Sequence, residues 1–148
     1  MREREVVHGR GHENGTAGHS STFEVTSDDW LTPAGDCILA VEADRVPADF
    51  DDAFVEACRD PEATIIATLT VTTDEGDTYA ETVEGRGHPD LVFENERSHV
   101  GRTSDYVDDR TILVGADAAA ADFDRELVDA LAAGADVRFE LVVERDQD

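Results

Sequence analysis

Apolar and polar residues alternate along several segments of the chain, and this alternation predicts strands. In residues 17–26, Phe23 and Val25 fall on the same side as His19, and most positions between them are polar. A period of two is that of a half-buried strand, whose successive side chains point to opposite faces. The same reasoning predicts further strands at residues 3–10, 37–43, 63–72, 78–83 and 137–143.

Two other segments carry apolar residues at helical spacing. The first begins at Pro47, a residue favoured in the first turn of a helix, and its buried side includes Phe54 and Cys58. The second begins near residue 121 and ends at Gly134, since glycine commonly follows the last turn of a helix. Two short helices among many strands predict an α+β, β-rich fold.

Short motifs recur in the same order in the two halves of the chain. Gly-Arg-Gly-His stands at residues 9–12 and again at 85–88, and Ala-Asp-Phe-Asp stands at 48–51 and again at 121–124. Chance does not readily produce several matches in one order. We therefore predict an internal duplication, in which each half contains three strands, a helix and a final strand.

The duplication also sets the expected domain organisation. A length of 148 residues suits one domain with a single core. We expect residues 1–148 to form that domain from two pseudo-repeats, at about residues 3–72 and 78–144. Half-units of this kind pack as a mostly antiparallel barrel or sandwich, here with two helices.

Charge is the strongest global signal. The chain has 36 acidic residues and 12 basic ones, all of them arginine, and its formal net charge is -24. Like charges repel one another at low ionic strength, whereas multimolar salt shortens the Debye length to about 3 Å or less. This composition predicts a halophilic protein from a salt-filled cytoplasm, and it disfavours non-specific binding to nucleic acid.

The sequence also indicates a soluble, cytoplasmic protein. Residues 1–10 are charged and lack the apolar core of a signal peptide, and no apolar run approaches the ~20 residues of a membrane span. The two cysteines, Cys37 and Cys58, are too few for a disulfide scaffold and are not spaced as a metal-binding pair.

One long stretch carries most of the chemically capable side chains. Residues 11–44, GHENGTAGHSSTFEVTSDDWLTPAGDCILAVEAD, closely resemble the archaeal family catalogued as domain of unknown function 371, and residues 104–106, 110–111 and 122–127 carry a similar signature in the second half. The resemblance implies an archaeal source and marks positions without assigning them roles. The marked positions are His12, Asn14, His19, Thr22, Glu24, Thr32, Asp36, Cys37, Arg110 and Thr111.

His19 is the most informative of these residues. The alternation places it inward, and a buried imidazole needs a hydrogen-bond partner or a metal. A backbone carbonyl or Ser21 can supply that partner, in which case His19 is structural. The second half offers Asn95 or Glu96 in place of His19 and Thr111 in place of Cys37, and this asymmetry favours a functional role for both residues.

Several residues could form a metal site or an anion site. His12, His19, Asp36 and Cys37 would offer mixed nitrogen, oxygen and sulfur ligands to a zinc-like divalent metal if they converge. The glycine-rich turn at residues 9–15 could alternatively cradle an anion, or it could be a turn that the fold needs twice. Arg110 could clamp an anion or pair with Asp36. The candidate ligand-binding residues are His12, Asn14, His19, Thr22, Thr32 and Arg110.

Three functional hypotheses follow from these residues. The first is a polar pocket in the first half that binds a metal ion or a small anionic ligand. The second is a hydrolase or transferase that uses His19 with Cys37 or Asp36 as catalytic residues. The third is a non-catalytic interaction module that joins a partner through an exposed sheet edge.

Overall fold

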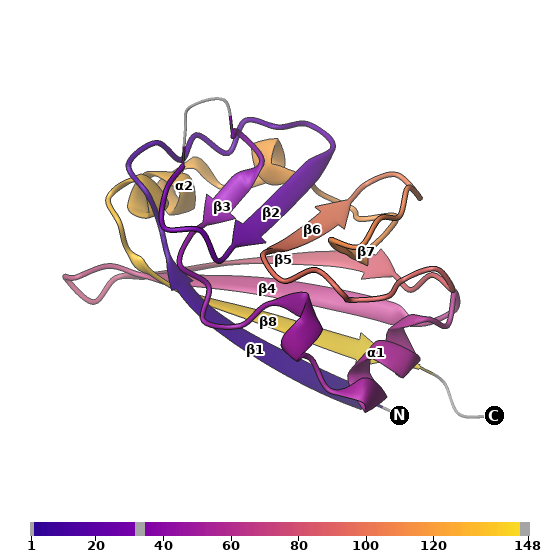
Figure 1. Ribbon diagram of the computed structural model, residues 1–148. Coiled ribbons are helices and arrows are strands. Elements are labelled where there is room, and N and C mark those ends of the chain that lie inside the picture. The colour runs from indigo at the N-terminus through magenta and orange to yellow at the C-terminus, as the bar shows by residue number, and fades with distance from the viewer. Residues whose placement is uncertain (1, 32–34, 146–148) are drawn as a thin grey trace.

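Two four-stranded sheets dominate the computed structural model, which describes residues 2–31 and 35–145 (Figure 1). The larger sheet is antiparallel, with the strand order β1 (Arg2–Arg10), β8 (Asp136–Glu144), β4 (Thr64–Thr72), β5 (Thr78–Arg86). The smaller sheet has the order β3 (Ile38–Ala40), β2 (Thr22–Thr26), β6 (Ser98–Arg102), β7 (Thr111–Leu113). Its central pair is antiparallel and its two outer pairs are parallel.

Helices lie between the strands in the order of the chain. The first half has the 3-10 helix η1 (Pro47–Asp49) and α1 (Asp52–Cys58), and the second half has η2 (Ala120–Asp122) and α2 (Arg125–Ala132). The helix expected from Pro47 is therefore a 3-10 turn followed by a short α-helix. Among the described residues, no helix is long and apolar enough to cross a bilayer.

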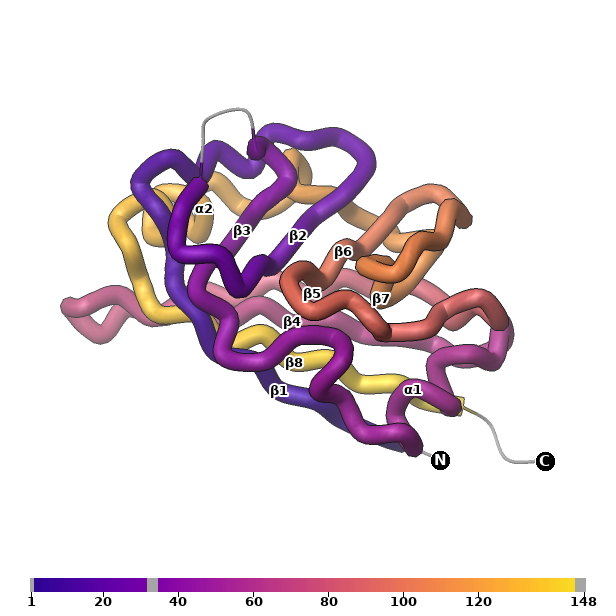
Figure 2. The backbone as a smooth tube through the Cα atoms, in the orientation of Figure 1, coloured from indigo at the N-terminus to yellow at the C-terminus, as the bar shows by residue number. Residues whose placement is uncertain are grey.

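The alternation of β4 explains how the larger sheet is positioned. Ile65, Leu69 and Val71 are buried, and the threonines between them lie on the opposite face. Apolar residues at every second position create one apolar face, which must be covered by another layer. The smaller sheet and both helices cover that face (Figures 1 and 2).

Aromatic rings join the layers in the core. Phe23 of β2 contacts Phe139 of β8 and Phe123, with ring centroids 6.4 Å and 6.1 Å apart. Phe50 and Phe54 contact each other near α1, with centroids 5.4 Å apart. The predicted β-rich α+β class is confirmed, and of its two architectures the fold is sandwich-like, because the sheets do not close into a barrel.

Two predicted strands are shorter than the alternation suggested. The strand expected at residues 17–26 begins only at Thr22, because Ala17 has a positive φ of 46° and the chain bends at Ser20 and Ser21. The strand expected at residues 37–43 ends at Ala40, and Glu42 has a φ of 56°. A left-handed residue interrupts the strand conformation, whatever the hydrophobic pattern.

The element order of residues 2–72 recurs in residues 78–144: three strands, a 3-10 helix, an α-helix and a long strand. Individual backbone contacts recur with it. Arg10 exchanges two backbone hydrogen bonds with Val41, and Arg86 does the same with Val114. The two sheets are thus connected at equivalent points in the two halves.

Candidate functional site

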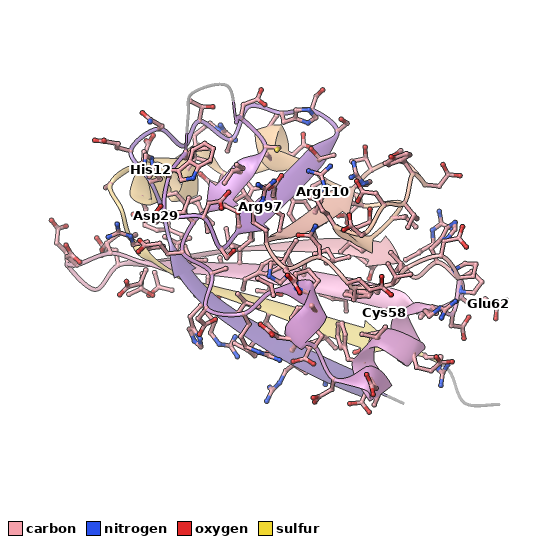
Figure 3. The ribbon with its side chains drawn as sticks, viewed as in Figure 1. His12, Asp29, Cys58, Glu62, Arg97 and Arg110 are labelled. Carbon is pink, nitrogen blue, oxygen red and sulfur yellow. The ribbon has the colours of Figure 1, made fainter. Side chains whose placement is uncertain are left out.

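The outer face of the smaller sheet collects most of the chemically capable side chains. In β2, Phe23 and Val25 point into the core, so that Thr22 and Glu24 point outward. We use the term outer face for the following residues on this side of the sheet and in the segments beside it: Thr22, Glu24, Cys37, Ile38, Arg97, Arg102, Asp108, Arg110 and Thr111. Arg97 and Arg110 lie beside the smaller sheet in Figure 3.

Cys37 and Glu24 are neighbours on the outer face. The Cys37 thiol donates to Glu24 Oε1 over 3.6 Å, and Glu24 is only 9% exposed. Burial and the Glu24 carboxylate together raise the pKa of the Cys37 thiol to about 11. Because the thiolate is the nucleophilic form, Cys37 lacks the activation that a nucleophilic role at neutral pH would require.

His19 lies in the loop that leads into β2, and the residue is half-buried instead of lying in the core as expected. Its Nδ1 accepts hydrogen bonds from the amides of Ser21 and Thr22, over 3.3 Å and 3.1 Å. Two amide donors require a bare lone pair on Nδ1, so the proton of the neutral ring lies on Nε2. The imidazole therefore holds a turn, and Nδ1 is not free to act as a base for Cys37 or Asp36.

The second half forms the same turn with an asparagine. Asn95 Oδ1 accepts hydrogen bonds from the amides of Arg97 and Ser98, over 2.8 Å and 2.7 Å. Asparagine commonly makes this kind of local contact with the backbone two or three residues on. In the sequence, the difference between His19 and Asn95 favoured a functional role for His19. In the structure both side chains accept hydrogen bonds from the amides two and three residues further along, so the difference is compatible with a structural role for both.

Asp108 organises the arginines of the outer face. Its carboxylate accepts hydrogen bonds from Arg102 at 2.9 Å and Arg110 at 3.1 Å, while the Thr111 hydroxyl donates to it at 3.1 Å. Burial opposes ionisation, but the bonds from Arg110 and the charge of Arg102 outweigh it and lower the pKa of Asp108 to about 2. The expected pairing of Arg110 with Asp36 is therefore replaced by a pairing with Asp108.

Glu24 extends this network toward Cys37. Burial disfavours the charge on Arg110, but Asp108 and then Glu24 more than compensate and raise the pKa of its guanidinium. Thr22 Oγ1 lies 3.0 Å from His19 Nδ1, and its hydrogen bond to Cys37 partly opposes the rise in the pKa of that thiol. Of the candidate residues, the structure thus brings His19, Thr22, Cys37 and Arg110 together along β2.

A pocket of about 310 Å³ opens beside this network. Trp30, which is 59% exposed, forms part of its wall together with apolar neighbours, and Arg97 approaches Asp28 at 3.7 Å on its polar side. The lining residues are Glu24, Asp28, Trp30, Leu31, Gly35, Ile38 and Arg97. At the other end of the outer face, Tyr106 is equally exposed and lies under the guanidinium of Arg102, 4.8 Å from its ring centroid.

His12 and Asn14 serve the loop around them. His12 Nδ1 accepts from the Asn14 amide at 3.0 Å, and the Asn14 side chain donates to the Leu31 carbonyl at 2.7 Å. His88 makes the matching contact with the amide of Asp90, also at 3.0 Å. The recurring contact supports the structural interpretation of the glycine-rich turn, and Figure 3 places His12 near α2, away from Arg110.

The remaining candidates do not complete a metal site. Within residues 2–31 and 35–145, no three His, Cys, Asp or Glu side chains gather so that they could hold a metal ion. The expected convergence of His12, His19, Asp36 and Cys37 is therefore not found, because two of these side chains are committed to local contacts. The carbonyl of Asp36 accepts from the amides of Gly18 and His19. Thr32 lies outside the described residues.

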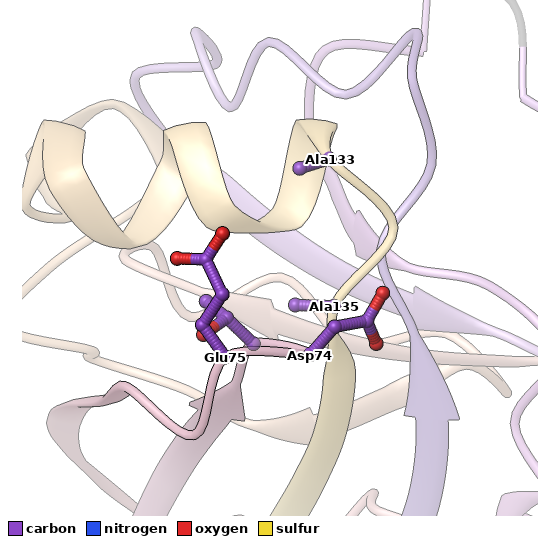
Figure 4. Close-up of a pocket in the computed structure, with 5 residues that line it drawn as sticks. Asp74, Glu75, Ala133 and Ala135 are labelled. Atoms are coloured by element: carbon purple, nitrogen blue, oxygen red, sulfur yellow. The ribbon is translucent and has the colours of Figure 1, made fainter.

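A second hollow, of about 220 Å³, lies between the β4–β5 turn and the end of α2 (Figure 4). Asp74 and Glu75 line it together with Ala133 and Ala135. The carbonyl end of a helix carries partial negative charge, so the end of α2 and the carboxylates of Asp74 and Glu75 are all negatively charged. This hollow is therefore unsuited to an anionic ligand, and it contains none of the candidate residues.

Sequence reasoning did not place Trp30, Asp28 or Asp108 in the candidate site. The available signal was weak: Trp30 and Tyr106 stand after similar Ser-Asp turns in the two halves. An aromatic residue in a polar turn is left exposed when no core position is within reach. Only the packing of the smaller sheet shows that both residues border one surface.

Comparison with known proteins agrees with the family resemblance found in the sequence, and it covers nearly the whole chain. The model of the family described as "Domain of unknown function (DUF371)" matches residues 7–144. The chain is 33% identical over 138 residues to a protein of the archaeon Methanocaldococcus jannaschii named "Uncharacterized protein MJ0206", and the match covers 93% of this chain and 98% of that protein. The chain belongs to the domain of unknown function 371 family.

Proposed function

We propose that the pocket beside Trp30 binds a small organic anion with an apolar or aromatic body. The observation that carries this proposal is the position of an arginine, Arg97, across from an exposed tryptophan in a chain with a net charge of -24. Trp30, Leu31 and Ile38 offer apolar surface to the body of the ligand. Tryptophan and arginine are the residues most often found where binding energy is concentrated.

Arg97 is suited to hold the charged group of the ligand. Its side chain is 59% exposed, and its guanidinium approaches Asp28 at 3.7 Å, which is longer than a hydrogen bond. A guanidinium carries five N–H donors in a planar fork, and this fork matches a carboxylate or a phosphate. Donors therefore remain for a ligand even while the ion pair with Asp28 persists.

The carboxylates of the pocket limit the kind of anion. Glu24 and Asp28 line the same pocket and would repel a compact, multiply charged ion such as free phosphate. They can instead accept hydrogen bonds from a ligand that has N–H or O–H groups. The preferred ligand is thus singly charged, with an apolar ring and a hydrogen-bond donor.

The single tryptophan of the chain makes this proposal testable by fluorescence. We expect salicylate to change the Trp30 emission saturably, whereas benzyl alcohol, which lacks the charge, should bind at least about tenfold more weakly. Arg97→Gln should weaken salicylate binding by a similar factor, because it removes the charge-assisted hydrogen bond. Arg138→Gln, on the larger sheet, is the matched control and should leave the affinity unchanged.

Two results would contradict the proposal. The first is the absence of any saturable change with salicylate in protein whose circular dichroism shows a folded state. The second is equal affinity of wild type and Arg97→Gln.

We also propose that the chain is halophilic. Its excess of carboxylates and its lack of lysine support this proposal, because screening is needed to relieve the repulsion among them. The midpoint of thermal unfolding should rise steeply as KCl increases from about 0.1 M to 1 M, over which the Debye length falls from ~10 Å to ~3 Å. An unfolding midpoint that does not change over this range would rule out the proposal.

We further propose that the two halves are pseudo-repeats of one ancestral unit. The matched element order and the matched contacts of Arg10 with Val41 and Arg86 with Val114 support this proposal. If it is correct, the equivalent glycines of the two turns, Gly11 and Gly87, should contribute equally to the free energy of unfolding.

A further inference from the structure

One broad face of the molecule has no covering layer among the described residues. Both helices and the smaller sheet pack on the same side of the larger sheet, so that its opposite side faces solvent. The strand registers place the following residues on this solvent face: Arg2, Arg4, Val6, His8 and Arg10 of β1; Asp136, Arg138, Glu140, Val142 and Glu144 of β8; Thr64, Ile66, Thr68, Thr70 and Thr72 of β4; Thr78, Ala80, Thr82, Glu84 and Arg86 of β5.

The charge of this solvent face differs from that of the whole chain. The face carries five of the 12 arginines and only four of the 36 acidic residues. Arginines and carboxylates also neutralise one another on it, since Arg138 and Arg4 lie 3.2 Å and 3.5 Å from Glu140. The central carboxylate of the face is therefore already paired with arginines, so that two molecules of net charge -24 repel each other less at this face than at an unpaired acidic surface.

The shape and chemistry of the face suit contact with another sheet. β4 has no charged residue among its nine, and its outward side consists of four threonines and Ile66. Short β-branched side chains form a level surface, which allows two sheets to pack about 10 Å apart. Ile66 stands beside Val142 of β8 in the register, so an apolar pair lies one row away from the central row, which holds Val6, Glu140, Thr68 and Thr82.

The size of the face matches that of a specific interface. Four strands spaced ~4.8 Å apart, with nine residues rising ~3.4 Å each, span about 600 Å² in projection. Side chains add to this planar area, and a standard interface buries about 800 Å² on each partner. Twofold symmetry needs only one such patch, because the same surface serves both copies.

We propose that the solvent face of the larger sheet is the surface on which two copies of this chain associate, sheet against sheet. A second copy is the occupant that the charges favour, because it brings a face with both signs of charge in near balance. The proposal is independent of the pocket beside Trp30, which lies on the smaller sheet.

Sedimentation velocity over about 5–200 µM protein in about 1 M KCl tests this association. We expect wild type to approach twice the chain mass of 16.1 kDa at the upper concentrations. Thr70→Glu should raise the dimer dissociation constant at least about tenfold, because it sets a carboxylate into the interface of each copy. Thr70 is paired with Arg138 in the register, so the new carboxylate has a partner within the monomer and folding should be retained.

Two further variants complete the test. Thr68→Arg should weaken the dimer as Thr70→Glu does, although its charge is opposite, while it can pair with Glu140 within the monomer. Ser20→Glu, in the exposed loop before β2, should leave the dimer unchanged. A wild-type protein that stays monomeric at every concentration would overturn the proposal, and so would a dimer that tolerates both threonine variants.

Discussion

Replacing Gly87 or Gly11 by alanine should lower the free energy of unfolding by about 3 kcal/mol or more. A Cβ on Gly87 would overlap the carbonyl oxygens of Cys58 and Asp60, and one on Gly11 would overlap the backbone of Leu131. These obstacles are main-chain atoms at the ends of α1 and α2, so they cannot rotate away as a flexible side chain could. Urea denaturation at constant high salt measures the loss.

Gly18→Ala is the matched control for these variants. The nearest heavy atoms to a Cβ on Gly18 belong to Asp36, at 3.9 Å, which is ordinary van der Waals contact. Its free energy of unfolding should stay within about 1 kcal/mol of wild type. Equal losses for Gly11 and Gly87 would support the pseudo-repeat proposal, whereas wild-type stability of Gly87→Ala would refute the packing of this turn on α1.

Acidification from pH 7.5 to 4.5 should remove about 2–3 kcal/mol of stability through one buried residue, His99. His99 is fully buried, stacked on Phe50 at a centroid distance of 5.4 Å, and its Nε2 donates to the carbonyl of Arg45 over 2.9 Å. Among the described residues, Nδ1 has no hydrogen-bond partner. A proton on Nδ1 would therefore be buried without an acceptor.

The sign of the effect follows from the pKa of His99. Burial, opposed by the hydrogen bond to Arg45 and reinforced by the Arg45 charge, lowers this pKa from 6.5 to about 4. In the unfolded chain His99 is protonated below about pH 6.5, whereas in the folded chain it stays neutral down to about pH 4. The contribution of neutral His99 to stability is complete above pH 6.5 and is lost progressively as the pH falls toward 4.

His99→Gln separates this effect from the titration of the many carboxylates. Glutamine keeps a donor for the Arg45 carbonyl but does not titrate, so its free energy of unfolding should fall less between pH 7.5 and 4.5, by about 2–3 kcal/mol. Parallel curves for wild type and His99→Gln would show that His99 does not control the acid sensitivity.

Hydrophobic periodicity predicted the parts of the fold in which one face of an element is buried. β4 and β8 alternate over nine residues each, and both appear where the pattern placed them. The prediction was less accurate at β2, where the segment before Thr22 alternates in the same way but has one residue with a positive φ. Alternation reports which side chains can be buried, and it does not report the backbone angles between strands.

Several of the residues proposed from the sequence lie close together in the structure. Thr22 lies in β2, and His19 and Cys37 of the same polar stretch contact Thr22 and Glu24 of that strand, whereas Arg110 reaches this surface from the second half of the chain. The roles of individual residues were not predictable, because they depend on the hydrogen bonds and ion pairs that each side chain forms once the chain has folded. Arg110, for example, was expected to pair with Asp36, but it pairs with Asp108, only two residues before it.

By itself, the sequence determined the β-rich α+β class, the order of elements and the family, because these depend on local periodicity and on motifs that neighbouring residues carry. Only the tertiary structure decided which polar residues meet. It turned Nδ1 of His19 onto its own backbone, kept the Cys37 thiol protonated beside Glu24 and left Trp30 exposed beside Arg97. Burial and charge pairing are properties of packed neighbours, and the packing of the two sheets sets both.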